Sequence, residues 1–382
     1  MSATPKDSEM KDGENRTLIK IVERPTFILK TREGENRAVS PSQRNGHKCR
    51  CIFRSINKTT RIKLEKYILA NRTVSTCPEM TTCIKFMDEN MQLCENPIDY
   101  LYDQQDFLVV GCLGAQGVGK STIISMLTSH YSSDIFQVQD LSYYESGANC
   151  TTGIDFFVTK NRIIYLDTQP ILSGSPIDYS NSFDQKKSTI DFANADPNLE
   201  LQSLQFAAFL FSVCHVVIFV QDWFVDPNLV RFLQTAEMLK PSSTTIMDQD
   251  YVEYYPHVVF LHNKAEVQDF MPNNINRMKA FYNKVFTSSR LQTHSGIDMT
   301  QSSTEGGLNL FLIPSSIKEE DMTFCETEKS LIDKLRIKIH GVPRNPMTPS
   351  VLTERSWYHY VSKVMEAIKK SHLSSEYGRL MP

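Results

Sequence analysis

Two features of exported and membrane proteins are missing from this sequence. Its longest apolar stretch, Phe206–Val220, is interrupted by Ser212 and His215 and is shorter than the roughly 20 residues that a membrane span needs. Residues 1–16 are polar and mixed in charge, without an apolar core, so no secretory signal is predicted. The sequence therefore predicts no membrane association.

Paired cysteines are missing as well. The nine cysteines are odd in number and scattered, and no two form a C-x-x-C pair. This favours a reducing, cytoplasmic setting over a disulfide framework. His47, Cys49 and Cys51 form the cluster closest to a metal site, but a structural zinc site takes about four ligands and no distant partner is evident. Free thiols are the favoured interpretation.

The composition is that of a globular protein with an uneven distribution of charge. Of the 382 residues, 41% are hydrophobic and 22% are charged, which excludes a wholly disordered or collagen-like chain. The net charge is −3, yet residues 37–66 hold nine basic side chains and a single acid, Glu65. This basic arm suits the acidic face of a protein partner or RNA phosphates. It has one aromatic residue for base stacking, Phe53, so the protein partner is favoured and RNA contact is the alternative.

The hydrophobic pattern predicts three regions. Residues 1–94 form a basic, partly disordered N-terminal extension, residues 95–342 form the folded domain, and residues 343–382 form a C-terminal helical segment. In this last region apolar residues recur at helical spacing from Trp357 to Ile368, with Thr353 as the expected N-cap. We expect this helix to pack back on the domain rather than to bind a partner.

Strands alternate with helices along the folded domain. Apolar runs predict buried strands at 106–113, 215–220, 257–261 and 308–313, a hairpin at 153–167, and helices at 120–128, 199–213, 229–239, 273–289 and 327–340. This alternation predicts an α/β fold, a G-domain-like three-layer sandwich in which helices cover both faces of a mostly parallel sheet.

The strongest motif is a phosphate-binding loop. Gly114–Ser121, GAQGVGKS, matches G-x-x-x-x-G-K-[ST] in full and lies between a predicted strand and a predicted helix. Its glycines let backbone N–H groups surround a β-phosphate, while Lys120 bridges the β- and γ-phosphates and the Ser121 hydroxyl suits Mg²⁺. A purine nucleotide with Mg²⁺ is the predicted ligand. The predicted contacts in this part of the chain are Gly114, Ala115, Gln116, Gly117, Val118, Gly119, Lys120, Ser121 and Thr122.

The segment that should sense the γ-phosphate departs from that of a working hydrolase. Residues 167–170 read Asp-Thr-Gln-Pro, where GTPases have Asp-x-x-Gly. Pro170 has no N–H to donate to the γ-phosphate, although Asp167 can still hold Mg²⁺ through water. Thr151 or Thr152 is the candidate for the threonine that closes over the metal. The predicted metal residues are Ser121, Thr152 and Asp167.

Residues 262–266, His-Asn-Lys-Ala-Glu, nearly match the guanine-reading Asn-Lys-x-Asp. Asn263 and Lys264 fit the motif, but Glu266 is one methylene longer than Asp and reaches the two guanine N–H groups only from a shifted backbone. Adenine lacks the N2 amino donor, and its N1 is an acceptor. GTP or GDP is favoured, and ATP or ADP stays open. Residues 315–318, Ser-Ser-Ile-Lys, are a loose form of the base-contacting Ser-Ala-Lys, but a solvated turn is the favoured interpretation.

Long segments of the sequence resemble one protein family. They read GAQGVGKS, TTGIDFF, YLDTQPIL, LQSLQFAAFLFSVCHVVIFVQDWF, RFLQTAEMLKP, YYPHVVFLHNKA and LTERSWYHY, and they fall within residues 95–382. Together they are similar to the ninth SMG factors of nonsense-mediated mRNA decay. The resemblance implies a G-domain-like protein that forms a heterodimer with the eighth SMG factor. It also implies that the pair regulates the phosphatidylinositol-3-kinase-like kinase of this pathway.

The G domain further resembles those of guanylate-binding proteins and atlastins, which are dynamin-like GTPases. Their phosphate loop carries an arginine finger where this sequence has Gly117, and such an arginine is worth on the order of 10³ or more in rate. Together with Pro170, this implies retained nucleotide binding and weak or absent hydrolysis, so no catalytic residue is assigned. The implied function is a nucleotide-binding regulatory subunit. The alternative is an active dynamin-like GTPase that its partner stimulates.

Overall fold

The computed structural model describes residues 78–128, 135–140, 143, 149–173, 195–222, 226–242, 253–299, 307–315 and 326–380. All of them fall within the unit Thr73–Pro382. The predicted basic arm at 37–66, the cluster at 47–51 and residues 316–318 lie outside the described residues. Among the helices that are described, none is long and apolar enough to cross a membrane.

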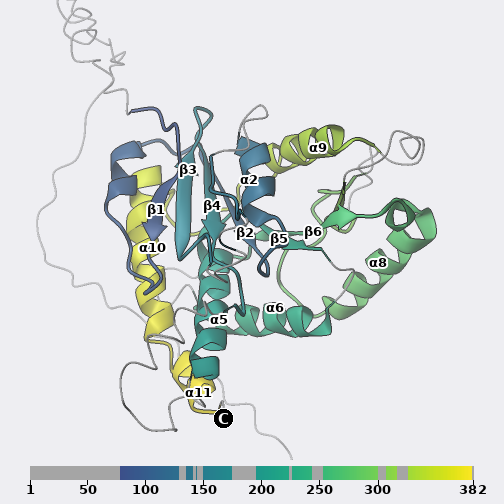
Figure 1. Ribbon diagram of the computed structural model, residues 1–382. Helices are drawn as coiled ribbons and strands as arrows, with labels where there is room; N and C mark the ends of the chain where they lie inside the picture. Colours follow the sequence, from purple (N-terminus) through teal and green to yellow (C-terminus); the bar gives the residue numbers. More distant parts are fainter. Residues whose placement is uncertain are drawn as a thin grey trace, which may run out of the picture. The chain divides into compact units, whose positions relative to one another are not determined.

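A seven-stranded sheet in the order β1-β3-β4-β2-β5-β6-β7 forms the centre of the domain (Figure 1). Its strands are β1 (Ile84–Met87), β2 (Leu108–Leu113), β3 (Ile154–Val158), β4 (Ile163–Thr168), β5 (Val216–Gln221), β6 (His257–Ala265) and β7 (Leu310–Pro314). Strands β4, β2, β5, β6 and β7 pair in parallel, whereas β1, β3 and β4 are antiparallel neighbours. Every residue of β2, β4, β5 and β7 is buried, because helices cover both faces of a parallel sheet. The predicted α/β fold is confirmed.

Helices form the two outer layers (Figure 1). On one side, α2 (Lys120–Thr128) contacts α9 (Glu328–His340) and β4, and α9 also contacts β7. On the other side, α5 (Ala195–Val213) lies against β2 and contacts α6 (Pro227–Leu239), α10 (Glu354–Lys369) and α11 (His372–Leu380). The remaining described helices are α8 (Pro272–Val285), η1 (Asn96–Tyr100) and η3 (Val267–Phe270).

The domain begins before residue 95, contrary to the predicted boundary. Strand β1 pairs with β3 at the edge of the sheet, with Ile84 opposite Phe156. Phe86 of β1 is fully buried and stacks on the rings of Phe156 and Trp357 at 5.6 and 5.7 Å. Aromatic burial of this kind contributes strongly to a core. Residues from 84 onward therefore belong to the folded domain and not to an extension.

The C-terminal helix α10 packs on the same domain. Thr353 caps it by accepting a hydrogen bond from the Ser356 N–H, as the sequence predicts. The Trp357 indole N–H donates to the Val213 carbonyl at the end of α5 at 2.9 Å. At the start of α10, the fully buried Glu354 carboxylate accepts from Arg162 Nε at 2.7 Å. A core aromatic residue and a buried ion pair thus fasten α10 to the sheet.

Strand β6 is longer than predicted, and this matters for the site. The apolar run ends at Leu261, but the strand continues to Ala265, which pairs with Pro314 of β7. Asn263 and Lys264 are therefore part of the strand end. Backbone pairing with a neighbouring strand extended the element beyond its apolar residues.

Candidate functional site

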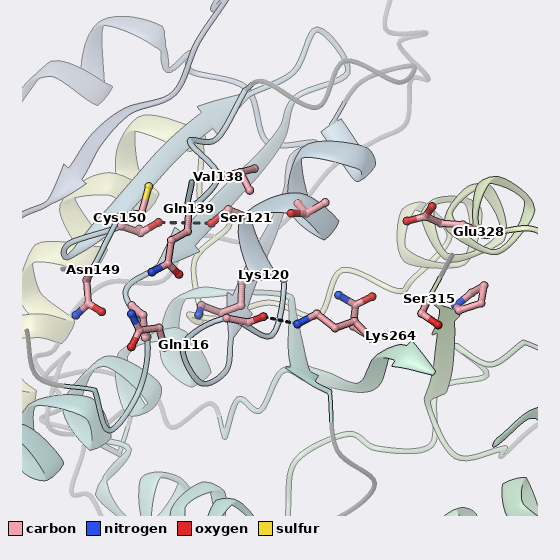
Figure 2. A pocket seen from close by; sticks show the side chains of 17 residues that line it. Gln116, Lys120, Ser121, Val138, Gln139, Asn149, Cys150, Lys264, Ser315 and Glu328 are labelled. Carbon is pink, nitrogen blue, oxygen red and sulfur yellow. Dashed lines mark hydrogen bonds between the residues drawn. The ribbon is translucent and has the colours of Figure 1, made fainter. Parts of the chain in front are cut away.

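A cleft of about 430 Å³ lies at the carboxyl ends of the parallel strands. This is where open α/β sheets place their ligands. Figure 2 shows Lys120 in the middle, amide side chains on one side of it, and Lys264, Ser315 and Glu328 on the other. The cleft is lined by Gln116, Gly117, Gly119, Lys120, Ser121, Thr122, Val138, Gln139, Asn149, Cys150, Thr151, Pro170, Asn263, Lys264, Pro314, Ser315 and Glu328.

The phosphate loop has the backbone that its glycines predict. Gly117 and Gly119 have φ angles of 75° and 91°, in the left-handed region that glycine adopts without strain. A Cβ at Gly114 would lie 2.2 Å from the Val220 carbonyl oxygen, and one at Gly119 would lie 2.3 Å from Asn263 Nδ2. Gly114, Ala115 and Val118 are absent from the lining of the cleft. The other predicted loop residues line the cleft.

A carbonyl of the phosphate loop itself holds the Lys120 side chain. Its side chain is only 6% exposed, and its Nζ donates to the Ala115 carbonyl at 2.8 Å. Burial lowers the pKa of Lys120, an effect that the nearby Asp167 opposes. Because the nearby Asp167 offsets only part of the cost of burying this ammonium, an anionic ligand would stabilise its charged form. The position fits phosphate binding.

Two hydroxyls and one carboxylate meet beside Lys120. The Ser121 and Thr151 hydroxyls both donate to Asp167 Oδ2, at 2.6 and 3.2 Å. The other carboxylate oxygen, Asp167 Oδ1, is buried and has no hydrogen-bond partner. Burial raises the pKa of Asp167 to about 6 in spite of Lys120. A cation at this position would give Oδ1 a partner and would stabilise the ionised carboxylate. The oxygen atoms of Ser121, Thr151 and Asp167 are hard donors, which suit Mg²⁺. The residues present therefore fit the predicted metal.

The threonine at this cluster is Thr151, and the assignment of Thr152 to the metal differs from the structure. Thr151 is buried and lines the cleft, whereas Thr152 is absent from the lining, and its carbonyl accepts a hydrogen bond from Lys85 Nζ at 2.6 Å. Both threonines lie in the irregular segment just before β3 begins at Ile154. Of the two threonines, Thr151 is the one whose hydroxyl is hydrogen-bonded to Asp167.

The segment after Asp167 is fastened without a ligand. Gln169 is tied twice to Gly153: its backbone N–H donates to the Gly153 carbonyl, and its side-chain Oε1 accepts from the Gly153 N–H, both at 2.8 Å. Ile171 N–H donates to the Gly114 carbonyl at 3.1 Å. Pro170 lines the cleft between these ties and offers no N–H to it. Gln169 is absent from the lining.

The base-reading motif is only half in place. Asn263 Nδ2 donates to the Val118 carbonyl at 2.8 Å and Lys264 Nζ to the Gly117 carbonyl at 2.7 Å, so both side chains brace the phosphate loop. Glu266 is exposed and absent from the lining. Its carboxylate accepts from Gln268 Nε2 at 2.7 Å at the start of η3. The carboxylate that would read guanine therefore points elsewhere. Ser315, read from the sequence as a solvated turn, lines the cleft.

Sequence motifs miss several lining residues. Val138, Gln139, Asn149 and Cys150 come from segments without a recognisable pattern, and Glu328 opens helix α9 far along the chain. No local signal marks them, because folding alone brings them to the loop. Within the described part of the chain, no group of three His, Cys, Asp or Glu residues could hold a metal ion, so a metal here must rely on the single carboxylate of Asp167 together with hydroxyls and ligand oxygens.

The sheet order and the loop geometry together define a P-loop α/β protein of the G-domain kind. No family model matches the chain. Nonsense-mediated mRNA decay factor SMG9 of Xenopus tropicalis is 40% identical over 79% of this chain and 68% of the relative. SMG9 of Salmo salar is 38% identical over the same shares. Protein SMG9 of Drosophila melanogaster is 26% identical over 71% of this chain and 57% of the relative. The chain belongs to the SMG9 family of nonsense-mediated mRNA decay factors.

One solved structure is a weak match. It is the ADP-ribosylation factor-like GTP-binding protein, or small COPII coat GTPase SAR1, of Encephalitozoon cuniculi in complex with GDP. It is 12% identical, with 74% of this chain and 94% of that chain covered and a TM-score of 0.28. A likeness this low has no bearing on function.

Proposed function

We propose that this protein is a nucleotide-binding regulatory subunit of nonsense-mediated mRNA decay that acts in the cytoplasm. The observation that supports binding most directly is the oxygen cluster at Asp167. Its Oδ1 has no hydrogen-bond partner, its Oδ2 accepts from Ser121, and the adjacent loop has the glycine geometry of a phosphate cradle. Family membership supports the pathway. The free cysteines of the described residues agree with a reducing compartment.

The expected ligand is a purine nucleotide with Mg²⁺. Lys120 and the loop would bind the β-phosphate, and Ser121, Thr151 and Asp167 would hold the metal directly or through water. Bound there, Mg²⁺ neutralises phosphate charge. The base stays open between guanine and adenine, because Glu266 is turned away from the cleft and Asn263 is engaged with Val118.

Hydrolysis is expected to be weak or absent. No arginine is found among the described residues that line the cleft, although an arginine finger supplies much of the rate in related reactions. Pro170 gives no N–H, and Gln169 is bonded to Gly153 instead of facing the cleft. The groups that remain can bind phosphate but have little with which to stabilise extra charge in a transition state.

The proposed partners are the eighth SMG factor and the phosphatidylinositol-3-kinase-like kinase of the pathway. Resemblance to the ninth SMG factors supports this pairing. In this role, nucleotide keeps the G domain in the shape that its partner binds. The rival function, a GTPase whose partner supplies an arginine in trans, predicts that phosphate release rises steeply when that partner is added.

The first test is to purify the native protein, denature it and identify any released nucleotide by chromatography with mass detection. Titration calorimetry with Mg²⁺ and GTP, GDP, ATP or ADP then compares wild type with Lys120→Ala. Lys160→Ala is the matched control, because Lys160 lies on the exposed β3–β4 turn, paired with Glu79 outside the cleft.

We expect a released purine nucleotide and at least a tenfold (~1.4 kcal/mol) loss of affinity in Lys120→Ala only, since removing a charged hydrogen-bond donor costs roughly 1.5–3 kcal/mol. Steady-state phosphate release should stay near background. A wild-type cleft that binds none of the four nucleotides would contradict the proposal, and brisk turnover without a partner would contradict its regulatory part.

A further inference from the structure

A second buried polar atom without a partner lies at the same cleft. Among the described residues, two buried side-chain atoms lack a hydrogen-bond partner, Asp167 Oδ1 and Gln139 Nε2. The first is an acceptor and the second a donor. Asp167 is bonded to two residues that line the cleft, and Gln139 lines it directly. Buried donors without partners are rare in folded proteins and call for an explanation.

The orphaned donor indicates a ligand atom that accepts a hydrogen bond. An N–H removed from water and left unpaired costs free energy that a partner recovers. The described protein atoms supply no acceptor for Gln139 Nε2. Gln139 is among the residues that line the cleft formed by the phosphate loop. An acceptor brought by the ligand therefore satisfies the donor.

The position of Gln139 in the cleft indicates which part of a bound nucleotide its side chain would contact. In Figure 2, Gln139 lies with Gln116 and Asn149 on one side of Lys120, opposite Lys264, Ser315 and Glu328. Lys264 belongs to the base-reading motif, so the base end of the cleft is the far side. Lys120 marks the β- and γ-phosphates. The amide side of the cleft is hence where the last phosphate of a triphosphate ends.

We propose that the Gln139 side-chain amide donates to the terminal phosphate of a bound nucleoside triphosphate and makes the cleft prefer triphosphate over diphosphate. This rests on the proposed function, since it requires nucleotide in the cleft. The amide supplies a donor at the end of the cleft where Pro170 cannot. A glycine at that position offers a backbone N–H, but Pro170 has none.

The neighbouring amides support a binding role without catalysis. Ser173 Oγ lies 3.0 Å from Gln116 Oε1 and 3.4 Å from Asn149 Oδ1, and Asn149 Nδ2 donates to the Ser173 carbonyl at 3.3 Å. These contacts fix two amide groups at the same end of the cleft. Amides donate to phosphate oxygens but carry no charge, so they give less than an arginine gives to a transition state. The end of the cleft thus recognises a phosphate without helping to cleave it.

The test compares triphosphate with diphosphate affinity in variants of the full chain. Gln139→Leu removes the donor, and Gln139→Glu keeps the shape while placing a carboxylate against the phosphate. Gln137→Leu is the matched control, because Gln137 lies two residues away, is exposed, and donates to the Tyr143 hydroxyl. Each variant is titrated in Mg²⁺ with GTPγS, GDP, ATPγS and ADP by calorimetry, after a melting curve confirms folding.

We expect Gln139→Leu to lose at least about tenfold in affinity for the preferred thiotriphosphate and less than twofold for the matching diphosphate. Gln139→Glu should lose more, and Gln137→Leu nothing. Equal losses for both nucleotides, or no loss, would overturn this inference while leaving the proposed function in place. If wild type binds none of the four, both fall. If Gln139→Leu unfolds at a lower temperature than wild type, the same comparison of triphosphate with diphosphate affinity is made with Gln139→Glu.

Discussion

The buried carboxylate of Asp167 should make the unliganded protein less stable as the pH rises. Burial raises its pKa from 3.8 to about 6, and Lys120, Ser121 and Thr151 offset only part of the effect. The folded state therefore holds this proton more tightly than the unfolded state. Well below pH 3.8 the carboxyl is protonated in both states and no penalty exists. As the pH rises through about 6, the folded state must bury a charge, at a cost of about 3 kcal/mol.

Asp167→Asn removes this titration while keeping the shape of the side chain. The measurement is urea unfolding of EDTA-treated protein at one-unit steps from pH 4 to 8, and the quantity of interest is variant minus wild type. We expect this difference to shift by about 2.5 kcal/mol in favour of the variant between pH 4 and pH 7.5. Saturating Mg²⁺ and nucleotide should shrink it, because the ligand compensates the wild-type carboxylate. Asp103→Asn, at an exposed carboxylate, should keep the wild-type profile. A flat difference across the pH range would refute the reasoning.

Two further predictions concern the loop and the C-terminal helix. Gly119→Ala places a Cβ 2.3 Å from Asn263 Nδ2 at a φ of +91°. Calorimetry should therefore detect no nucleotide binding, and melting curves should show at least the roughly 1–2 kcal/mol cost of a left-handed alanine. A variant with wild-type nucleotide affinity would contradict this prediction. Arg162→Met leaves the fully buried Glu354 without its counter-charge and should cost about 3–5 kcal/mol in unfolding free energy. Adding Glu354→Leu should recover much of that loss, and a double variant no more stable than Arg162→Met would show that the pair is not coupled.

Much of the fold follows from local pattern. Continuous apolar runs predicted strands β2, β5 and β7, because a parallel strand buried on both faces must be apolar at every position. The phosphate loop was predictable for the same local reason: its glycines, lysine and serine are close in sequence. The β3–β4 hairpin was also visible, with its turn at Arg162, a residue with φ of 59°.

Features that depend on distant contacts were not predictable. Strand β1 is four residues long, and Phe86 shows its role only when Phe156 and Trp357 stack on it. The choice of Thr151 over Thr152 depends on which way the chain enters β3. Gln139 belongs to no motif at all, and only the placement of its segment over the loop gives its amide a possible ligand.

The hydrogen bonds around the cleft suit a ligand that stabilises one conformation of the domain rather than one that switches the domain between two conformations. In signalling GTPases the γ-phosphate orders two loops that are released after hydrolysis. Here Gln169 already joins the Thr151 segment through Gly153, and Ile171 is bonded to the phosphate loop, all through the protein's own atoms. A ligand shifts a conformational equilibrium only by the difference in its affinity for the two states. Because these segments are already joined, bound nucleotide has little left to order there. In the proposed role, its binding energy would instead add to the stability of one domain shape.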